Sequence, residues 1–337
     1  MDQVRRERFI NLDGKSILVT GGTGSFGHAF VEAVTRSATP ARLVVLSRDE
    51  MKHEEMQRLF PPADFPYMRF FIGDVRDFER LKMAMVNIDY VVHAAAQKIV
   101  PMAEYNPFEC IHTNIIGMEN VVRAALQSGV QKVIALSTDK AASPINLYGA
   151  TKLASDKICI AANHLSGENG AIFSVVRYGN VLNSRGSVVP FFRNLIETGE
   201  RVLPVTDDRM TRFWITLPQA VEFVLSSLEI MRGGELFVPK IPTVKILDLV
   251  SALGDSLEHK IVGVRPGEKL HEAMITTDEA RYTLDFEDRY IVEPNINLYH
   301  RHSFTDDGGV RVPEDFHYSS ETNTDVLSVE QLRTLLS

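Results

Sequence analysis

The sequence contains little cysteine. Only Cys110 and Cys159 occur among its 337 residues, and both lie in apolar stretches with helical spacing. Small secreted folds that depend on disulfides use many more cysteines, so we expect no disulfide framework and a reducing compartment. The same scarcity gives no support for a metal site, and we predict none.

Long apolar runs are also missing. No window approaches the roughly 20 apolar residues that a helix needs to span a bilayer. The charged stretch 1–14 is not followed by the apolar segment of a secretory signal. We therefore expect a cytoplasmic protein that does not associate with a membrane.

A basic excess is absent as well. Asp and Glu number 44 against 36 Lys and Arg, which gives a formal net charge of −8. Binding to a polyphosphate duplex requires a basic stripe, and none is visible, so we expect no nucleic-acid partner. Small anionic substrates remain open, because a few local cations suffice to hold them.

The first half of the sequence instead alternates short apolar runs with segments of helical spacing. Such runs are typical of parallel strands covered on both faces, and we predict strands at 16–20, 42–47, 69–73, 88–93, 132–137 and 171–177. The segments between them predict helices at 25–36, 49–59, 77–86, 106–128 and 148–164. This order predicts an α/β fold, a Rossmann-like doubly wound parallel sheet whose ligands bind beyond the carboxyl ends of the strands.

The pattern changes after Arg177. Residues 180–190 are rich in Gly, Ser and Asn, and scattered prolines follow, while 215–231 and 243–254 have helical spacing. We predict a smaller C-terminal α/β lobe that binds substrate. The division is 1–179, together with 211–235, for a dinucleotide-binding domain, and 180–210 with 236–337 for the lobe.

A glycine-rich loop follows the first predicted strand. Gly21-Gly-Thr-Gly24-Ser-Phe-Gly27 lies between that strand and a helix, where glycines permit a tight turn and the close approach of a pyrophosphate. A simple turn is the alternative, but the strand and helix on either side favour dinucleotide binding.

Two cations follow the second predicted strand. Arg48 and Lys52 can hold a 2′-phosphate and Ser47 can add a hydroxyl donor, so we predict NADP; the alternative is a solvated helix start. Asp49 is a candidate N-cap of that helix. Asp74-Val75, after the third strand, is a candidate contact to the adenine ring, unless Asp74 merely caps the next helix.

Tyr148-Gly-Ala-Thr-Lys152 places a phenol and an ammonium one helical turn apart, on one face. A nearby lysine and an oxidised nicotinamide would stabilise the phenolate, which allows hydride removal from an alcohol carbon. The spacing alone is weak. It gains weight from Ser137-Thr138 at the end of a predicted strand.

With His93-Ala-Ala-Ala96 and Thr113-Asn114, these motifs resemble the extended short-chain dehydrogenase/reductase superfamily. Thr138-Asp139-Lys140 narrows the resemblance, because retaining dehydratases usually carry Asp-Glu here and epimerases lack an acid–base pair. The stretch 136–152 is similar to the inverting UDP-N-acetylglucosamine 4,6-dehydratases, particularly those that open pseudaminic acid synthesis for surface and flagellin glycans. Further similarity extends over almost the whole chain, including Arg265-Pro-Gly-Glu-Lys-Leu-His271.

The resemblance implies a redox-neutral elimination. Tyr148, supported by Thr138 and Lys152, would deprotonate the sugar 4-hydroxyl as hydride leaves C4; Lys140 would then remove the C5 proton, and Asp139 would protonate the departing 6-hydroxyl. Lys140 must be neutral and Asp139 protonated for these steps, so the two are expected to titrate as a coupled pair.

The resemblance also implies binding residues. Those expected to contact NADP are Gly21, Thr23, Gly24, Ser25, Phe26, Gly27, Ser47, Arg48, Asp49, Lys52, Asp74, Val75, Ala94, Ala96, Lys98, Asn114, Tyr148 and Lys152. Those expected to contact UDP-N-acetylglucosamine are Lys98, Asn180, Val188, Thr206, Arg265 and Glu268. Arg185, Arg212 and Arg265 lie in sequence typical of loops and are candidates for the diphosphate. A homo-oligomer, such as a hexamer, is a further implication.

Two other functions remain open. A C4-epimerase, or a C5-epimerising dehydratase for another capsule or O-antigen sugar, would keep Tyr148 and Lys152, although Lys140 weighs against a simple epimerase. A non-catalytic NADP-sensing regulator on the same fold would not need that pair.

Overall fold

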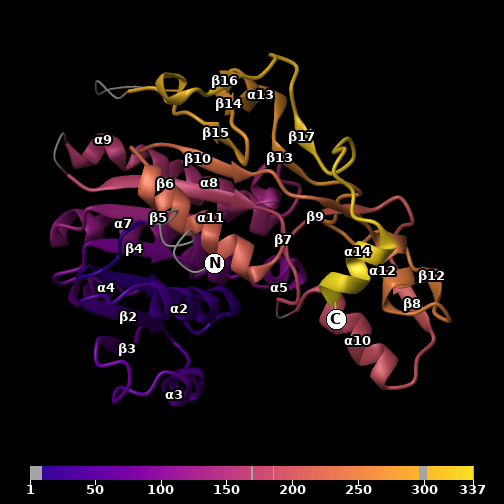
Figure 1. The fold of residues 1–337 in the computed structure, drawn as a ribbon, viewed down its shortest axis with the longest axis horizontal. Coiled ribbons are helices and arrows are strands. Elements are labelled where there is room, and N and C mark those ends of the chain that lie inside the picture. The colour runs from indigo at the N-terminus through magenta and orange to yellow at the C-terminus, as the bar shows by residue number, and fades with distance from the viewer. Residues whose placement is uncertain (1–9, 168–169, 185, 296–301, 337) are drawn as a thin grey trace.

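A ten-stranded sheet runs through the computed structural model, which describes residues 10–167, 170–184, 186–295 and 302–336. Its strand order is β16-β14-β15-β10-β6-β5-β4-β1-β2-β3 (Figure 1). Neighbours from β3 to β10 are parallel, and β15, β14 and β16 continue the sheet antiparallel. The strands are β1 Ser16–Thr20, β2 Arg42–Ser47, β3 Met68–Ile72, β4 Tyr90–His93, β5 Lys132–Thr138, β6 Ile172–Tyr178, β10 Leu236–Pro239, β14 Thr283–Asp285, β15 Arg289–Val292 and β16 Val310–Arg311.

All six predicted strands are present, and each end lies within two residues of its predicted position. The central strand β1 shows why, because its residues Ile17, Leu18 and Val19 are fully buried between helices on both faces of the sheet. A strand covered on both faces has a continuous apolar sequence, which the sequence displays. The doubly wound α/β fold is confirmed.

Helices cover both faces of the sheet. α2 (Ser25–Ser37) packs against α11 (Leu217–Ile230), and α11 crosses the front of the sheet in Figure 1. α7 (Gly117–Ser128) packs between α4 (Phe78–Ala84) and α8 (Leu147–Ala161). The other helices of this half are α3 Glu50–Leu59, α5 Val100–Tyr105, α6 Pro107–Ile111, the π-helical turn η1 His112–Ile116, the 3₁₀ turn η2 Asp139–Ala141 and α9 Asn163–Ser166.

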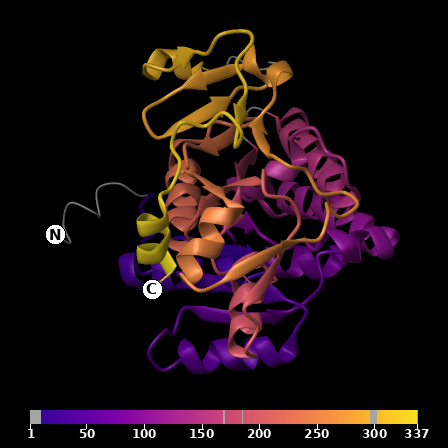
Figure 2. The same cartoon turned by 90° about the vertical axis from the view of Figure 1, so that its right-hand side faces the viewer.

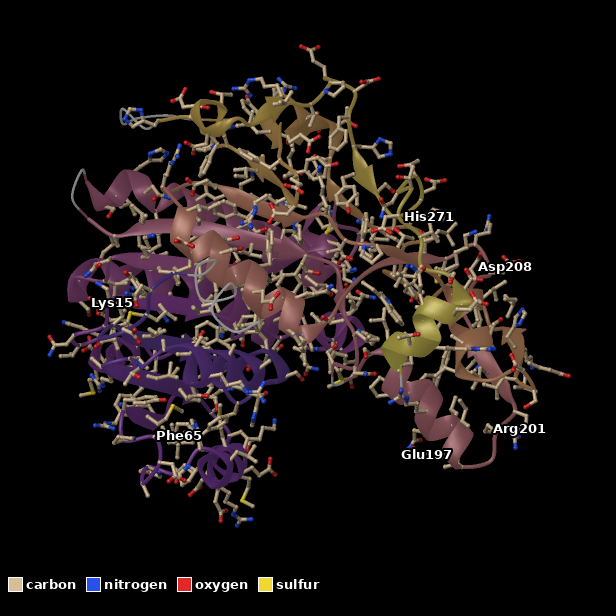
Figure 3. All side chains as sticks on the ribbon, in the orientation of Figure 1. Lys15, Phe65, Glu197, Arg201, Asp208 and His271 are labelled. Atoms are coloured by element: carbon tan, nitrogen blue, oxygen red, sulfur yellow. The ribbon has the colours of Figure 1, made fainter. Side chains whose placement is uncertain are left out.

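A smaller lobe lies beside the sheet, and Figure 2 looks directly onto it. Its apolar core, which includes Phe192, Trp214, Leu249 and Leu332, is separate from the core of the sheet. Glu197 and Arg201 lie at the outer end of the lobe in Figure 3. Its helices are α10 Val188–Glu197, α12 Ile246–Leu253 and α14 Val329–Leu336. Its strands form a triplet of β7 Asn180–Val181, β9 Thr211–Ile215 and β11 Thr243–Lys245 and a pair of β8 Val202–Val205 and β12 Glu258–Ile261.

The division of the chain differs from the predicted ranges. The range 236–337 was assigned to the lobe, yet β10, β14, β15 and β16 belong to the main sheet. The physical reason is that β6 would otherwise be an edge strand with unpaired backbone N–H and C=O groups. β10 pairs with β6 in parallel and so satisfies these groups. The remaining elements are β13 Ala273–Ile275, α13 Thr277–Ala280, η3 Phe304–Asp307 and β17 Tyr318–Ser319, of which β13 and β17 pair with each other and η3 lies between β15 and β16 in the sequence.

No helix in the described part of the chain is both long and apolar enough to cross a membrane.

Candidate active site

One large cavity of about 1490 Å³ lies between the carboxyl ends of the parallel strands and the smaller lobe. Its size exceeds that of a typical single-ligand pocket, roughly 300–1,000 Å³. The glycine-rich loop, the ends of β2 and β5, and segments of the lobe all line it. The cavity therefore has room for a dinucleotide and a second ligand side by side.

The glycine-rich loop forms one wall. Gly21 has a φ of +65°, and a Cβ there would lie 2.8 Å from the backbone of Ala95. At Gly27 a Cβ would lie 2.1 Å from the carbonyl oxygen of Gly22, so only glycine lets α2 pack against the turn. Helix α2 begins after Gly24 with no side-chain cap, which directs its first N–H groups toward an anion.

The end of β2 carries the predicted phosphate clamp. The Ser47 hydroxyl lies 2.8 Å from that of Thr23, which ties the glycine loop to the second strand. Lys52 Nζ lies 2.9 Å from Asp49 Oδ2, and Asp49 also caps α3 by accepting from the Lys52 backbone N–H, as predicted. Arg48 and Lys52 are both partly exposed and line the cavity.

Asp74 lies at the end of β3 beside two arginines. Burial raises the pKa of its carboxyl, but a hydrogen bond and charge from Arg76, with a smaller effect of Arg48, hold that pKa below its usual range. The N-cap of the next helix is Asp77, so Asp74 does not have the capping alternative. Asp74 and Val75 both line the cavity.

Two buried side chains, His93 and Asn114, position the end of β4 and the loop after it. His93 is buried, its Nδ1 lies 2.7 Å from the Thr20 hydroxyl, and burial together with the charge of Lys152 lowers its pKa to about 3. Asn114 accepts from the Gln97 backbone N–H at 2.8 Å and donates to the Gln97 carbonyl at 3.0 Å. Ala94, Ala96 and Lys98 line the cavity.

Two residues predicted to contact the cofactor do not line the cavity formed by the described residues. The Asn114 carboxamide is occupied by the loop backbone, and Gly27 packs against the turn. Both residues support the cavity wall without lining it. The sequence motif alone does not separate such a supporting residue from one that contacts the cofactor.

The end of β5 meets the start of α8. Asn146 caps α8 by accepting from the Gly149 backbone N–H at 2.7 Å. A Cβ at Gly149 would lie 2.2 Å from the Lys140 carbonyl oxygen, so the missing side chain lets α8 approach the turn η2. This approach brings Tyr148 and Lys140 into the same cavity.

Tyr148 and Lys152 lie one helical turn apart on α8, facing the cavity. Burial raises the pKa of Tyr148 to about 12, although Lys140 and a hydrogen bond with Thr138 lower it in part. Lys152 is 3% exposed, donates to the Leu136 carbonyl at 2.7 Å, and has its pKa lowered by burial.

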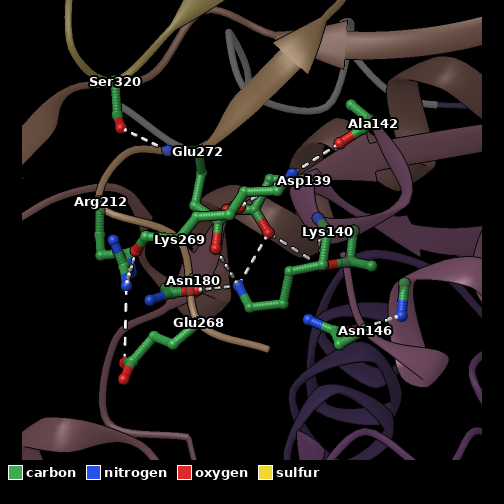
Figure 4. A network of polar contacts seen from close by, with 12 residues as sticks. Asp139, Lys140, Ala142, Asn146, Asn180, Arg212, Glu268, Lys269, Glu272 and Ser320 are labelled. Carbon is green, nitrogen blue, oxygen red and sulfur yellow. Dashed lines mark hydrogen bonds and ion pairs between the residues drawn. The ribbon is translucent and has the colours of Figure 1, made fainter. Parts of the chain in front are cut away.

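Asp139 and Lys140 form an ion pair in the turn η2 (Figure 4). Asp139 is fully buried, and its Oδ1 accepts from the Thr138 hydroxyl at 2.9 Å and from Lys140 Nζ at 3.0 Å. The Lys140 amine also donates to Asn180 Oδ1 at 3.2 Å and lies 3.3 Å from Glu272 Oε1. Its side chain is 22% exposed, toward the cavity.

The smaller lobe supplies the opposite wall. The five residues predicted there for the substrate all line the cavity, namely Asn180, Val188, Thr206, Arg265 and Glu268. Arg265 Nε lies 3.2 Å from Glu268 Oε2, and a second cation, Arg212, lies 3.6 Å from Glu268 Oε1. Arg185 lies outside the described residues.

Arg212 was predicted to lie in a loop, but it belongs to strand β9. Its guanidinium donates to three carbonyls, those of Thr211, Lys269 and Leu270, and the side chain lines the cavity. Glu272 was not predicted at all. It follows the motif 265–271 directly, yet a single acidic residue in a polar stretch gives no signal without knowledge of its partner Lys140.

Parallel strand ends, a glycine-rich turn and a tyrosine–lysine helix that share one cavity define the class, the extended short-chain dehydrogenases/reductases. Residues 17–294 match the model of the family described as polysaccharide biosynthesis proteins, and the chain belongs to this family.

Individual relatives cover nearly the whole chain. An inverting UDP-N-acetylglucosamine 4,6-dehydratase of Campylobacter jejuni is 52% identical over 96% of this chain and 98% of its own length. A UDP-glucose 4-epimerase of Rickettsia conorii is 38% identical over 96% and 95% of the two chains. The crystal structure of Pen from Bacillus thuringiensis superposes with a TM-score of 0.87 at 35% identity, covering 96% of this chain and 98% of that one.

Proposed function

We propose that the protein is a UDP-N-acetylglucosamine 4,6-dehydratase that inverts C5, giving UDP-2-acetamido-2,6-dideoxy-β-L-arabino-hexos-4-ulose. The observation that carries this proposal is that Lys140, which is paired with the fully buried Asp139 behind it, lines the same cavity as Tyr148 and Lys152. Such a site holds the groups for alcohol oxidation and the groups for elimination together. The 52% identity to a relative with this name supports the same assignment.

The oxidation step uses α8. Tyr148 takes the proton of the sugar 4-hydroxyl, and Lys152 and Thr138 stabilise the phenolate. Its pKa of about 12 in the absence of a bound nicotinamide is too high for this task at neutral pH, so the positive ring of an oxidised cofactor is expected to lower it. When bound, the dinucleotide supplies a hydride acceptor for C4 and a hydride donor for C6.

The elimination step uses η2. A ketone at C4 makes the C5 hydrogen acidic, so Lys140 removes that proton and Asp139 protonates the leaving 6-hydroxyl through an enolate. Reprotonation of C5 from the opposite face inverts the centre. Water is the only group lost, and the hydride that left C4 returns at C6.

NADP is the proposed cofactor. The residues fit a dinucleotide, because the loop is closed to any side chain at Gly21 and Gly27 and α2 begins with uncapped N–H groups. Arg48 and Lys52 lie at the end of β2 on the cavity, where a ribose 2′-phosphate belongs. Their present partners are the partly buried Asp74 at 3.6 Å and the more exposed Asp49 at 2.9 Å, and a phosphate can replace both as a partner of these cations.

The nucleotide sugar occupies the lobe side of the cavity. Arg265 and Arg212 are suited to the diphosphate, while Asn180, Val188, Thr206, Glu268 and Lys98 contact the remainder. The predicted division assigned 1–179 with 211–235 to the cofactor and 180–210 with 236–337 to the substrate. We propose it with two changes, in which β9 joins the substrate lobe and β10, β14, β15 and β16 join the sheet.

An epimerase is the second candidate, and the 38% identity to a UDP-glucose 4-epimerase favours it. A C4-epimerase requires Tyr148 and Lys152 but makes no use of an acid and a base at C5 and C6. Asp139, fully buried and paired with Lys140, would then have no task. A regulator that only senses NADP would need neither pair.

We further infer a homo-oligomer, such as a hexamer, that acts in the cytoplasm at the first step of pseudaminic acid synthesis for surface or flagellin glycans. Apolar side chains support the association, since Tyr105 on α5 and Phe108 on α6 are 85% and 74% exposed. The two free, buried cysteines support a reducing compartment.

The test is incubation of the purified protein with UDP-N-acetylglucosamine and NADP⁺ in D₂O, followed by NMR. We expect a 6-deoxy-4-keto product with deuterium at C5 and inverted configuration. Unchanged sugar, or a product altered only at C4, would refute the proposal, and the second outcome would establish the epimerase.

A further inference from the structure

Glu272 is a buried carboxylate that the mechanism above does not use. It lies between the motif 265–271 and strand β13, with 3% of its side chain exposed. Its Oε1 lies 3.3 Å from Lys140 Nζ, on the cavity wall (Figure 4). Two carboxylates, those of Asp139 and Glu272, therefore share one ammonium.

The backbone of Glu272 is fixed by a distant segment. Its N–H donates to Ser320 Oγ at 2.9 Å, and its carbonyl accepts from the Ser320 N–H at 2.8 Å. The Ser320 hydroxyl in turn contacts Thr211 Oγ1 at 2.8 Å. Such double anchoring holds a side chain in one place, which a surface ion pair does not need.

The two carboxylates differ in their hydrogen bonds. Asp139 Oδ1 accepts from both Thr138 and Lys140. Each carboxylate also has one oxygen that is buried without a hydrogen-bond partner among the described residues, Asp139 Oδ2 and Glu272 Oε2. The difference lies in the oxygens that face Lys140, because Asp139 Oδ1 already accepts from the Thr138 hydroxyl, whereas Glu272 Oε1 lies 3.3 Å from Lys140 Nζ with no such second donor among the described residues. A proton moving from Lys140 onto Glu272 Oε1 thus disturbs fewer hydrogen bonds than one moving onto Asp139 Oδ1.

Lys140 has to lose a proton before it can act as a base. Burial lowers the pKa of its amine, but the charges of Asp139 and Glu272 outweigh burial and the opposing charge of Arg212, so the pKa lies above its usual value. At neutral pH the resting side chain is an ammonium. An acceptor must therefore lie within reach of Nζ inside the cavity.

We propose that Glu272 is a positioning residue that orients Lys140 and accepts its proton, which converts Lys140 into the base for C5. This inference rests on the proposed function and extends it to a residue outside the sequence motifs. Asp139 is then reserved for the 6-hydroxyl.

The protons balance over one cycle when Tyr148 is included, because the proton that it takes from the 4-hydroxyl passes to Asp139, which gives it to the leaving 6-hydroxyl. A proton passes from Lys140 Nζ to Glu272 Oε1, leaving an amine and a carboxylic acid. The amine takes the C5 proton, and the C–H electron pair moves into the enolate. Glu272 then releases its proton to solvent, which also supplies the proton that reaches C5 from the opposite face.

The groups that face Lys140 and Glu272 come from several elements. They are Asp139 and Tyr148 from η2 and α8, Asn180 from β7, Arg212 from β9 and Lys269 from the loop before β13. The proton transfers proposed for the cycle involve Asp139, Lys140, Glu272 and Tyr148.

The variant Glu272→Gln keeps the shape of the side chain and cannot take the proton. In D₂O at neutral pH we expect C5 exchange and dehydration to fall by at least about 100-fold, the range typical of a lost proton-transfer partner. Reduction of bound NADP⁺ by the sugar in a single turnover, which depends on Tyr148 and Lys152, should stay within about threefold of wild type. Glu321→Gln, at a neighbouring side chain that is 62% exposed, is the matched control and should behave as wild type.

The pH profile separates proton acceptance from a merely structural role. Without the acceptor, Lys140 must lose its proton to solvent, so the rate of Glu272→Gln should climb about tenfold per pH unit toward the alkaline range, whereas the wild-type rate stays nearly level near neutrality. A second variant, Glu272→Ala, should regain C5 exchange when formate is added. This rescue also tests the proposal if the glutamine variant folds poorly.

Wild-type C5 exchange in Glu272→Gln at neutral pH would overturn this inference and leave the proposed function standing. Equal loss at every pH without rescue by formate would also overturn it. A wild-type protein that neither exchanges C5 nor dehydrates the sugar would refute the proposed function, and the inference with it.

Discussion

Replacing Arg177, on strand β6, tests how much a buried ion pair contributes to the stability of the protein. Its side chain is 1% exposed; it donates to the Met274 carbonyl at 2.9 Å and to both carboxylate oxygens of Glu279 at 3.0 Å. Asp156, which accepts from Ser137, lies 3.7 Å away. In Arg177→Met these acceptors would lose their buried cation.

The expected cost is large because it arises from buried groups. Removing one partner of a buried ion pair costs about 3–5 kcal/mol, and a whole domain is stable by only about 5–15 kcal/mol. We expect Arg177→Met to lose about 3–5 kcal/mol at pH 7, measured by urea unfolding. The control is Arg58→Met, whose pair with Glu54 is mostly exposed, with an expected change of at most about 0.5 kcal/mol.

The pH dependence adds a second criterion. Burial raises the pKa of Glu279, but Arg177 outweighs it and holds that pKa below its usual value. A group with a lowered folded-state pKa stabilises the protein above its unfolded pKa, and this contribution is lost as pH falls through the folded value. The difference between wild type and Arg177→Met should therefore shrink as pH falls below about 4. A loss under about 1 kcal/mol at pH 7, or a pH-independent loss, would refute the reasoning.

Two further predictions concern ligands and chemistry. Lys140→Ala should lower dehydration and C5 exchange by at least about 100-fold while NADP still binds, as measured by NMR in D₂O and by fluorescence titration; full turnover would show that Lys140 is misassigned. Replacing Arg48 and Lys52 together by Ala should weaken NADP binding by roughly 10- to 100-fold and leave NAD binding nearly unchanged, because each charged contact contributes about 1.5–3 kcal/mol before solvent screening. Equal weakening of both dinucleotides, measured by calorimetry, would argue against a 2′-phosphate site there.

The dinucleotide half was predictable because its signals are local. β1 is a continuous apolar run, and Gly21–Gly27 follow it at once, so strand, turn and helix are readable in one short stretch. The same holds for Tyr148 and Lys152, whose spacing alone places them on one face of α8. The resemblance contributed the roles of Asp139 and Lys140.

The parts that were not predicted depend on distant partners. Strand β9 carries Arg212 in the short sequence Thr-Arg-Phe-Trp-Ile, which shows no alternation and becomes a strand by pairing with β7 and β11. Glu272 gains its environment from Lys140 and Ser320, both remote in the sequence. Asn114 was predicted to contact the cofactor, but its carboxamide pairs with the backbone of Gln97, a partner that the sequence motif does not reveal.

The two hydrogen bonds between Ser320 and Glu272 also bear on the order in which the site is completed. During synthesis the glycine loop, Tyr148 and Lys140 emerge early, whereas Ser320 follows β17 near the end of the chain. A chain shortened before β17 would keep the parallel strands and the dinucleotide loop but lose the anchor of Glu272. Dinucleotide binding and proton transfer at Lys140 thus depend on segments that are far apart in the sequence, although they share one cavity.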